Sequence, residues 1–177
     1  MRKITLAALA LAGSAALIGV TAVPAFAASD TTPVTVTVTA GALSISAPAD
    51  TTLTAALPGA TSTTILANTV VTDGRSGTAG WVATVTLSTL TGTIPAGTPG
   101  TILATGATYT AGQASKTGTV TVTAATVITD LSTAKTSQTA TSVSGNNTAT
   151  WTGDLAVPIP AGALADTYSG TLTQSVS

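Results

Sequence analysis

The sequence predicts an all-β fold, a single antiparallel β-sandwich of the Ig-like or Greek-key type with about eight strands. Three observations lead to this prediction. Val and Thr alternate with a period of two in several segments, which is typical of strands with one buried and one solvated face. Helix-supporting ion pairs are scarce because the chain has no Glu and only five Lys and Arg residues. Turn-forming Gly, Pro and Asn residues separate the alternating segments at regular intervals.

The first segment, residues 1–27, has the pattern of a secretory signal peptide. Arg2 and Lys3 precede a long run of Ala, Leu, Ile and Val, and Ala25-Phe26-Ala27 matches an A-x-A cleavage site. The alternative is an uncleaved membrane anchor, for which the apolar run is long enough. Cleavage would leave residues 28–177 as one domain, with three basic and six acidic residues and a net charge of −3. No later apolar run in the sequence reaches the ~20 residues of a transmembrane helix.

Four strands are expected in the first half of this domain, at residues 33–39, 42–47, 64–72 and 80–89. The first has the clearest alternation, because Val34, Val36 and Val38 alternate with Thr residues. The parity of the apolar positions changes after Ala40-Gly41, where we expect a bulge or a tight bend. In the fourth strand Trp81 shares its face with Ala83, Val85 and Leu87, which indicates a core position for the indole.

Four more strands are expected at residues 101–110, 117–128, 147–157 and 167–176. Val120 and Val122 alternate with Thr in the second of them, and Trp151, Leu155 and Val157 share one face of the third. Since aromatic residues make up only 3% of the chain, the two Trp side chains are expected to fill much of the core.

The composition excludes whole classes of chemistry. Without His or Cys the chain has no Ser-His-Asp triad, no Cys-His nucleophile and no ordinary zinc site. Five basic residues are too few for a phosphate-neutralising patch, so nucleic acid is not an expected partner. The six Asp residues lie scattered near turns, where they favour turn formation over catalysis. We therefore expect no enzyme activity, no catalytic residues, no metal site and no cofactor.

One glycine-rich segment, residues 73–80, stands out before the Trp81 strand. A phosphate-binding loop would lead into a helix, but this segment leads into a strand. The simpler interpretation is a hairpin loop with Arg75 paired to Asp73. The alternative is a loop that presents Arg75 beside Trp81 to a carbohydrate or a peptide.

The order of several short motifs resembles the WxL family of bacterial surface proteins. The matching stretches cover nearly all of residues 28–177. They are Gly41-Ala42-Leu43-Ser44-Ile45, Val71-Thr72-Asp73-Gly74-Arg75-Ser76-Gly77, Gly80-Trp81, Val157-Pro158 and Asp166-Thr167-Tyr168-Ser169-Gly170-Thr171-Leu172-Thr173. The chain departs from the family where Val82-Ala83 follows Trp81, and where Thr173-Gln174-Ser175 replaces the second Trp-x-Leu. The resemblance implies a secreted β-rich domain that attaches noncovalently to the Gram-positive cell wall.

The leading functional hypothesis is therefore a nonenzymatic cell-envelope protein, extracellular or associated with the wall. Its expected partner is a wall polymer, either peptidoglycan or an associated glycan, or another surface protein. The candidate contact residues are Arg75, Trp81 and Trp151. The first alternative is a structural subunit of a surface assembly or filament, which self-associates by pairing strands at a sheet edge. The second is a secreted carbohydrate-active hydrolase, which would need two Asp side chains facing each other across a cleft.

Overall fold

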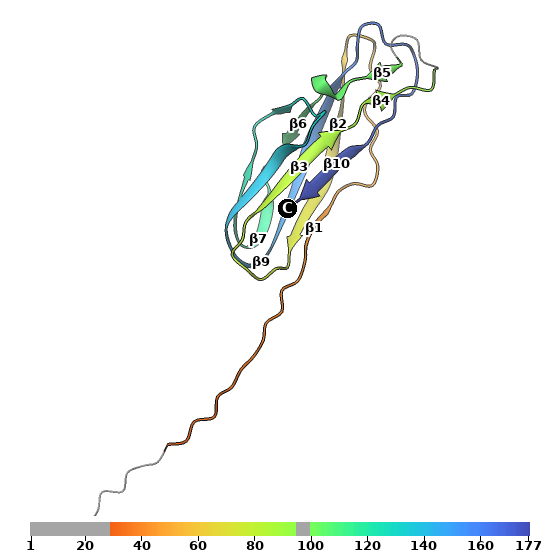
Figure 1. The fold of residues 1–177 in the computed structure, drawn as a ribbon. Coiled ribbons are helices and arrows are strands. Elements are labelled where there is room, and N and C mark those ends of the chain that lie inside the picture. Colours follow the sequence, from red (N-terminus) through yellow and green to blue (C-terminus); the bar gives the residue numbers. More distant parts are fainter. Residues whose placement is uncertain (1–28, 95–99) are drawn as a thin grey trace, which may run out of the picture. The chain divides into compact units, whose positions relative to one another are not determined.

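The fold of the described residues, 29–94 and 100–177, is all-β, as predicted. A computed structural model gives ten strands and one short 3-10 helix in this part of the chain (Figure 1). All strand pairs are antiparallel. The strands are β1 (Leu43–Ser46), β2 (Thr61–Asp73), β3 (Trp81–Leu87), β4 (Leu90–Thr91), β5 (Thr101–Ile102), β6 (Thr108–Ala111), β7 (Ser115–Ala124), β8 (Ile128–Thr129), β9 (Lys135–Pro158) and β10 (Leu172–Val176).

The 24-residue strand β9 connects the two layers of the sandwich. Residues 135–140 pair with β3, whose other neighbour is β10, while residues 147–158 pair with β2, whose other neighbour is β1. Between these two parts the chain turns back, and Ser142 and Gly145 have φ angles of 52° and 72°. Strand β7 follows β9 around the same corner and changes direction at Gly118, with a φ of 73° (Figure 1). The two layers are thus halves of one hydrogen-bonded sheet.

The core lies between these layers and contains the aromatic side chains that the alternation predicted. Trp81 and Trp151 are each 2% exposed, and β3 alternates buried and half-buried residues along its whole length. The Trp151 indole N–H donates to the Tyr109 hydroxyl over 3.2 Å, so burial leaves neither polar group unpaired. Burying each such large side chain stabilises the fold by about 1.5–3 kcal/mol.

The prediction of a strand at residues 33–39 is wrong. Residues 29–42 contain no strand, and Val34, Val36 and Val38 are 90%, 87% and 78% exposed. The alternation has the right period for a strand, but the described part of this chain supplies no partner for it. The expected bend at Ala40-Gly41 is therefore not a bend between two strands; instead the Gly41 N–H donates to the Gly74 carbonyl over 2.8 Å.

The strand predicted at residues 101–110 is also wrong as one element. It divides into β5, a 3-10 helix at Ala104–Gly106 and β6. The Ala104 carbonyl accepts hydrogen bonds from the N–H groups of Ala107 and Leu131, which closes the helical turn. As a result β5 pairs with β4 in a separate two-stranded sheet, while β6 pairs with β8 and β9.

The remaining predicted strands are present with shifted ends. The strand expected at 117–128 is β7, followed by the separate short β8, and the strand expected at 167–176 begins only at Leu172. The first part of β9, residues 135–146, was not predicted. The signal peptide assigned to residues 1–27 lies outside the described residues. Among the residues that are described, no helix has the length and apolar character needed to cross a membrane.

Candidate functional site

The glycine-rich segment forms a structured corner at the end of the sandwich where β2 passes into β3. We call residues 73–81 together with residues 145–147 the Arg75 corner. Asp73 ends β2, Trp81 begins β3, and Asn147 faces Asp73 in the β2–β9 register. The Gly145 N–H donates to the Gly77 carbonyl over 2.9 Å, which joins the glycine-rich segment to the turn of β9.

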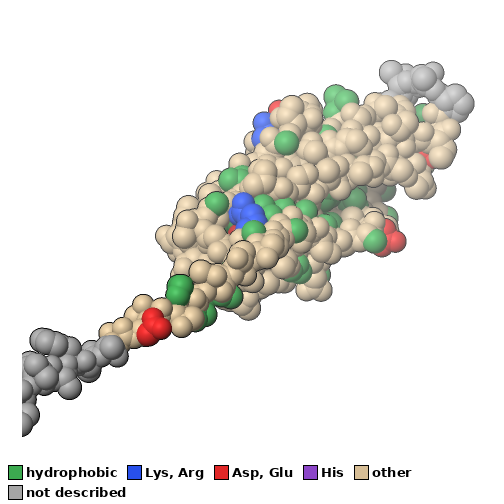
Figure 2. Space-filling view, turned by 60° about the horizontal axis from the view of Figure 1, so that its bottom comes forward, with side chains coloured by type: hydrophobic (Ala, Val, Ile, Leu, Met, Phe, Trp, Pro, Cys, Tyr) green, Lys and Arg blue, Asp and Glu red, His purple; other side chains and the backbone are tan. Residues whose placement is uncertain are grey.

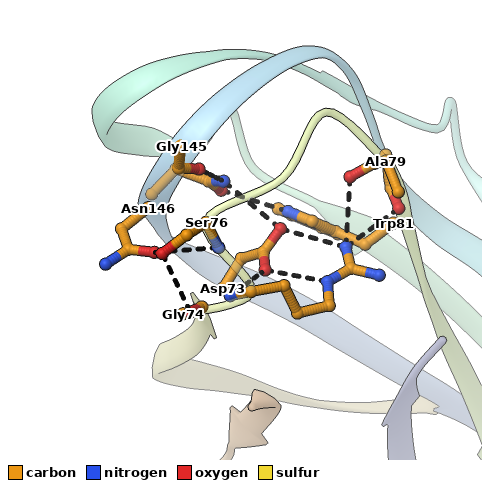
Figure 3. A network of polar contacts seen from close by, with 10 residues as sticks. Asp73, Gly74, Ser76, Ala79, Trp81, Gly145 and Asn146 are labelled. Carbon is orange, nitrogen blue, oxygen red and sulfur yellow. Dashed lines mark hydrogen bonds and ion pairs between the residues drawn. The ribbon is translucent and has the colours of Figure 1, made fainter. Parts of the chain in front are cut away.

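Arg75 and Asp73 form a two-pronged ion pair at the centre of this corner (Figure 3). Arg75 Nε donates to Asp73 Oδ1 over 2.8 Å, and Nη2 donates to Oδ2 over 3.0 Å. The Arg75 backbone N–H also donates to Oδ1 over 3.1 Å. These bonds to Arg75 hold the pKa of the Asp73 carboxyl below its usual value, although its burial acts in the opposite direction. The pairing of Asp73 with Arg75 that the sequence suggested is therefore confirmed.

The same guanidinium also fixes the loop that follows it. Nη2 lies 3.2 Å from the Ala79 carbonyl and 3.0 Å from the Gly80 carbonyl (Figure 3). Gly80 passes so close to the Ala140 carbonyl that a Cβ would collide with it. Arg75 thereby closes residues 73–80 into a rigid loop against the start of β3.

Two asparagines extend the network to β9. The Asn147 side chain is 3% exposed; it accepts the Trp81 indole N–H over 3.2 Å and donates to Asp73 Oδ2 over 3.3 Å. Its neighbour Asn146 is exposed, and its Oδ1 accepts from the Ser76 N–H over 3.1 Å and from the Ser76 hydroxyl over 2.8 Å (Figure 3). The sequence indicated only a turn at these asparagines. No periodic signal revealed that Asn147 bridges a buried carboxylate and an indole.

The corner presents fixed hydrogen-bond donors to solvent. The Arg75 side chain is 30% exposed, and within the described residues its Nη1 has no hydrogen-bond acceptor. Within the described residues, Nδ2 of Asn146 also has no hydrogen-bond acceptor. Because Asp73 balances the charge of Arg75, the corner is a nearly neutral polar surface. Such a surface suits the hydroxyl and carbonyl groups of a polymer.

The three predicted contact residues have different positions. Arg75 lies at the surface, as a contact residue requires. Trp81 lies beneath it in the same corner, and Trp151 lies deeper in the core beside Tyr109. Both indoles are 2% exposed, so the structure does not support direct contact between either ring and a polymer. Their place on the apolar faces of their strands accounts for this burial.

Other carboxylates of the described residues stabilise turns. Asp130 accepts from the Ser132 N–H and hydroxyl, and Asp166 accepts from the Thr93 hydroxyl and the Ile94 N–H. These hydrogen bonds lower the pKa of both carboxyl groups. In this part of the chain no three His, Cys, Asp or Glu residues gather in a way that would hold a metal ion. Charged side chains are few on the face seen in Figure 2.

A second surface feature is a groove of about 900 Å³ between the layers, which no sequence pattern predicted. It is lined by residues 47–58 and 163–172 and by side chains of both layers, among them the buried Leu66, Leu87 and Leu155. Leu57, which also lines it, is 78% exposed. We call this feature the interlayer groove.

Comparisons of the chain with protein families, with curated proteins and with solved structures found no match.

Proposed function

We propose that this protein is a nonenzymatic domain of the Gram-positive cell surface, similar to WxL proteins, that binds a wall glycan noncovalently. The observation that carries the proposal is the Arg75 corner. Two of the motifs that carry the resemblance, residues 71–77 and Gly80-Trp81, form a preorganised loop with outward donors on Arg75 and Asn146. A fixed loop loses little conformational entropy when it binds a polymer.

The corner also suits a neutral ligand. Arg75 donates to Asp73, and the pair brings no net charge to the surface. An uncharged glycan would therefore bind through hydrogen bonds to its hydroxyl groups, with weak dependence on salt. Binding to an anionic wall polymer would instead weaken strongly as salt rises.

The direct test is retention of the secreted protein on purified Gram-positive cell walls. We expect retention that survives moderate salt and is lost after the walls are digested. Retention no greater than that of an unrelated exported β-sandwich would contradict the proposal.

Variants locate the surface without unfolding the domain. Asn146→Ala and Ser76→Ala alter two exposed side chains of the corner, and we expect severalfold weaker retention for both. Thr121→Ala on β7 is the matched control, because it removes an exposed polar group that belongs neither to the corner nor to the groove. Equal loss in all three variants would show that the Arg75 corner is not the binding surface.

A further inference from the structure

The segment at residues 29–39 is rich in hydroxyl groups and lies outside the strands. Six of its eleven residues are Ser or Thr, and Pro33 lies among them. None of these eleven residues belongs to a strand, and all of them are exposed. Ser and Thr together with Pro, outside a packed core, form a composition that is typical of segments carrying O-linked sugars.

The hydroxyl groups of Thr35, Thr37 and Thr39 are available for reaction. They have no hydrogen-bond partner among the described residues. Other threonines differ in this respect, since the hydroxyls of Thr117 and Thr148 lie 2.6 Å apart and hydrogen-bond with each other. A paired hydroxyl must first give up its hydrogen bond in order to react, whereas a free hydroxyl loses none.

The backbone of the segment is available as well, and this separates it from the sheet. Strand β7 has threonines at the same spacing, Thr119, Thr121 and Thr123, and their side chains are also exposed. However, the backbone of β7 is paired with β9. Enzymes and domains that recognise an extended peptide hold it by hydrogen bonds to its backbone. Residues outside the sheet can enter such a cleft, whereas β7 would first have to leave the sheet.

The segment also needs protection against pairing with other chains. Residues 31–49 carry no charge, and Val34, Val36 and Val38 are 90%, 87% and 78% exposed. Proteins usually keep exposed segments with this alternation from aggregating by placing charged residues in or beside them. No charge provides this protection here. Bulky hydrophilic groups on the alternating threonines would prevent pairing in its place.

We propose that Thr35, Thr37 and Thr39 are O-glycosylated as the chain is exported. The threonine oxygen attacks the anomeric carbon of a sugar that is carried as a glycosyl phosphate. The new bond from carbon to the threonine oxygen replaces the bond from that carbon to the phosphate oxygen. The phosphate leaves with the bonding electrons, and the hydroxyl proton passes to a base of the transferase. The inference rests on export, which is part of the proposed function, and not on glycan binding by the Arg75 corner.

The experiment measures the mass of the full chain as its natural producer exports it, both intact and after digestion into peptides. We expect the mature chain to be heavier than its sequence by a whole number of sugar residues. Fragmentation that preserves side-chain modifications should locate the added mass on Thr35, Thr37 and Thr39. Alkaline β-elimination should remove the added sugar, and the same chain made in the cytosol should have the mass of its sequence.

Two triple variants compare the free segment with a paired strand. The first combines Thr35→Ala, Thr37→Ala and Thr39→Ala, and removes the proposed acceptors. The matched control combines Thr119→Ala, Thr121→Ala and Thr123→Ala, with the same residue type, spacing and exposure on β7. We expect the first variant to lose the added sugar and the control to keep all of it. Sugar on the β7 threonines of the wild type would contradict the assignment, and the peptide map of the wild type decides this even if a variant fails to fold.

The outcomes distinguish this inference from the proposed function. An exported chain in which residues 29–42 have the mass of their sequence would overturn the inference alone, and so would phosphate groups in place of sugars. A chain that stays in the cytosol would overturn it together with the proposed function. Retention on cell walls is a separate measurement and can fail while the sugars are present.

Discussion

Among the described residues, Asp73 is the charged residue that is buried, with 2% of its surface exposed. The structure of the Arg75 corner depends on its carboxylate. Its carboxylate accepts from Arg75 and Asn147, and Asn147 in turn holds the Trp81 indole. A buried charge is stable only when it is paired and hydrogen-bonded, so loss of any one partner leaves a neighbour unsatisfied.

Asp73→Asn should show this dependence through pH. The folded-state pKa of Asp73 is lowered below an unfolded value of about 3.9, so its contribution to stability is fully present above that value and is lost as the pH falls through the folded pKa. We expect the melting temperature of Asp73→Asn to lie below that of the wild type at about pH 6, and the difference to shrink toward about pH 2. Thermal unfolding followed by circular dichroism between about pH 2 and pH 6 measures this difference in melting temperature. A difference that is constant with pH would show that the Asp73 charge does not stabilise the corner.

Trp81 has two separable contributions, the packing of its ring and the bond from its N–H to Asn147. Trp81→Phe keeps most of the ring but leaves Asn147 Oδ1 without its donor, and should lower the free energy of unfolding by about 1–3 kcal/mol. Trp81→Ala also removes the ring from the core and should lower it by about 3–5 kcal/mol. Urea titration measures both. Equal and small losses would indicate that the ring is not packed in the core.

At the scale of elements, the turns of β7 and β9 bring the two layers together. Both strands change direction at residues with positive φ, Gly118 in β7 and Ser142 with Gly145 in β9. At Gly118 an added Cβ would also collide with the Asn146 carbonyl. The bend that these paired strands share therefore needs glycine at one defined position.

Gly118→Ala should consequently destabilise the domain by about 1–3 kcal/mol, from the strain of a positive φ together with the collision. Gly77→Ala is the control, since its Cβ would lie 3.9 Å from the Arg75 carbonyl oxygen, an ordinary contact distance. Chemical denaturation of both variants provides the comparison. If Gly118→Ala unfolds at the same denaturant concentration as Gly77→Ala, β7 does not bend as described.

The elements that could be predicted are those in which apolar residues alternate against a partner in the same chain. Strands β2, β3 and the second part of β9 satisfy this condition, and the parity of Trp81 and Trp151 correctly indicated burial. The first part of β9 was not predicted because two of its buried residues, Ser137 and Gln138, are polar. Ser137 donates to the Ala83 carbonyl and Gln138 to the Gly112 carbonyl. Hydrogen bonding of this kind leaves no hydropathy pattern in the sequence.

Residues 33–39 show the opposite case. Their alternation is the clearest in the chain. However, periodicity indicates only that a segment could form a half-buried strand, and it does not identify the strand with which it would pair. The candidate site could likewise be predicted only in part. The Asp73–Arg75 pair follows from the spacing of two residues between them. Asn147, in contrast, reaches Asp73 only through the register of β2 with β9. The interlayer groove depends on where both layers end, which no local pattern records.

At the scale of the whole molecule, the Arg75 corner is the proposed glycan surface. Charged residues are only 6% of the chain, so electrostatic repulsion between copies is weak. Copies bound close together on one glycan would therefore repel one another little.

The most direct measurement for the central claim is fractionation of cells that produce the full chain, with and without digestion of the wall, followed by N-terminal sequencing. We expect a product that begins at Ala28, sediments with intact walls and is released when the wall is digested. An intact chain beginning at Met1 in the cytosol would contradict it.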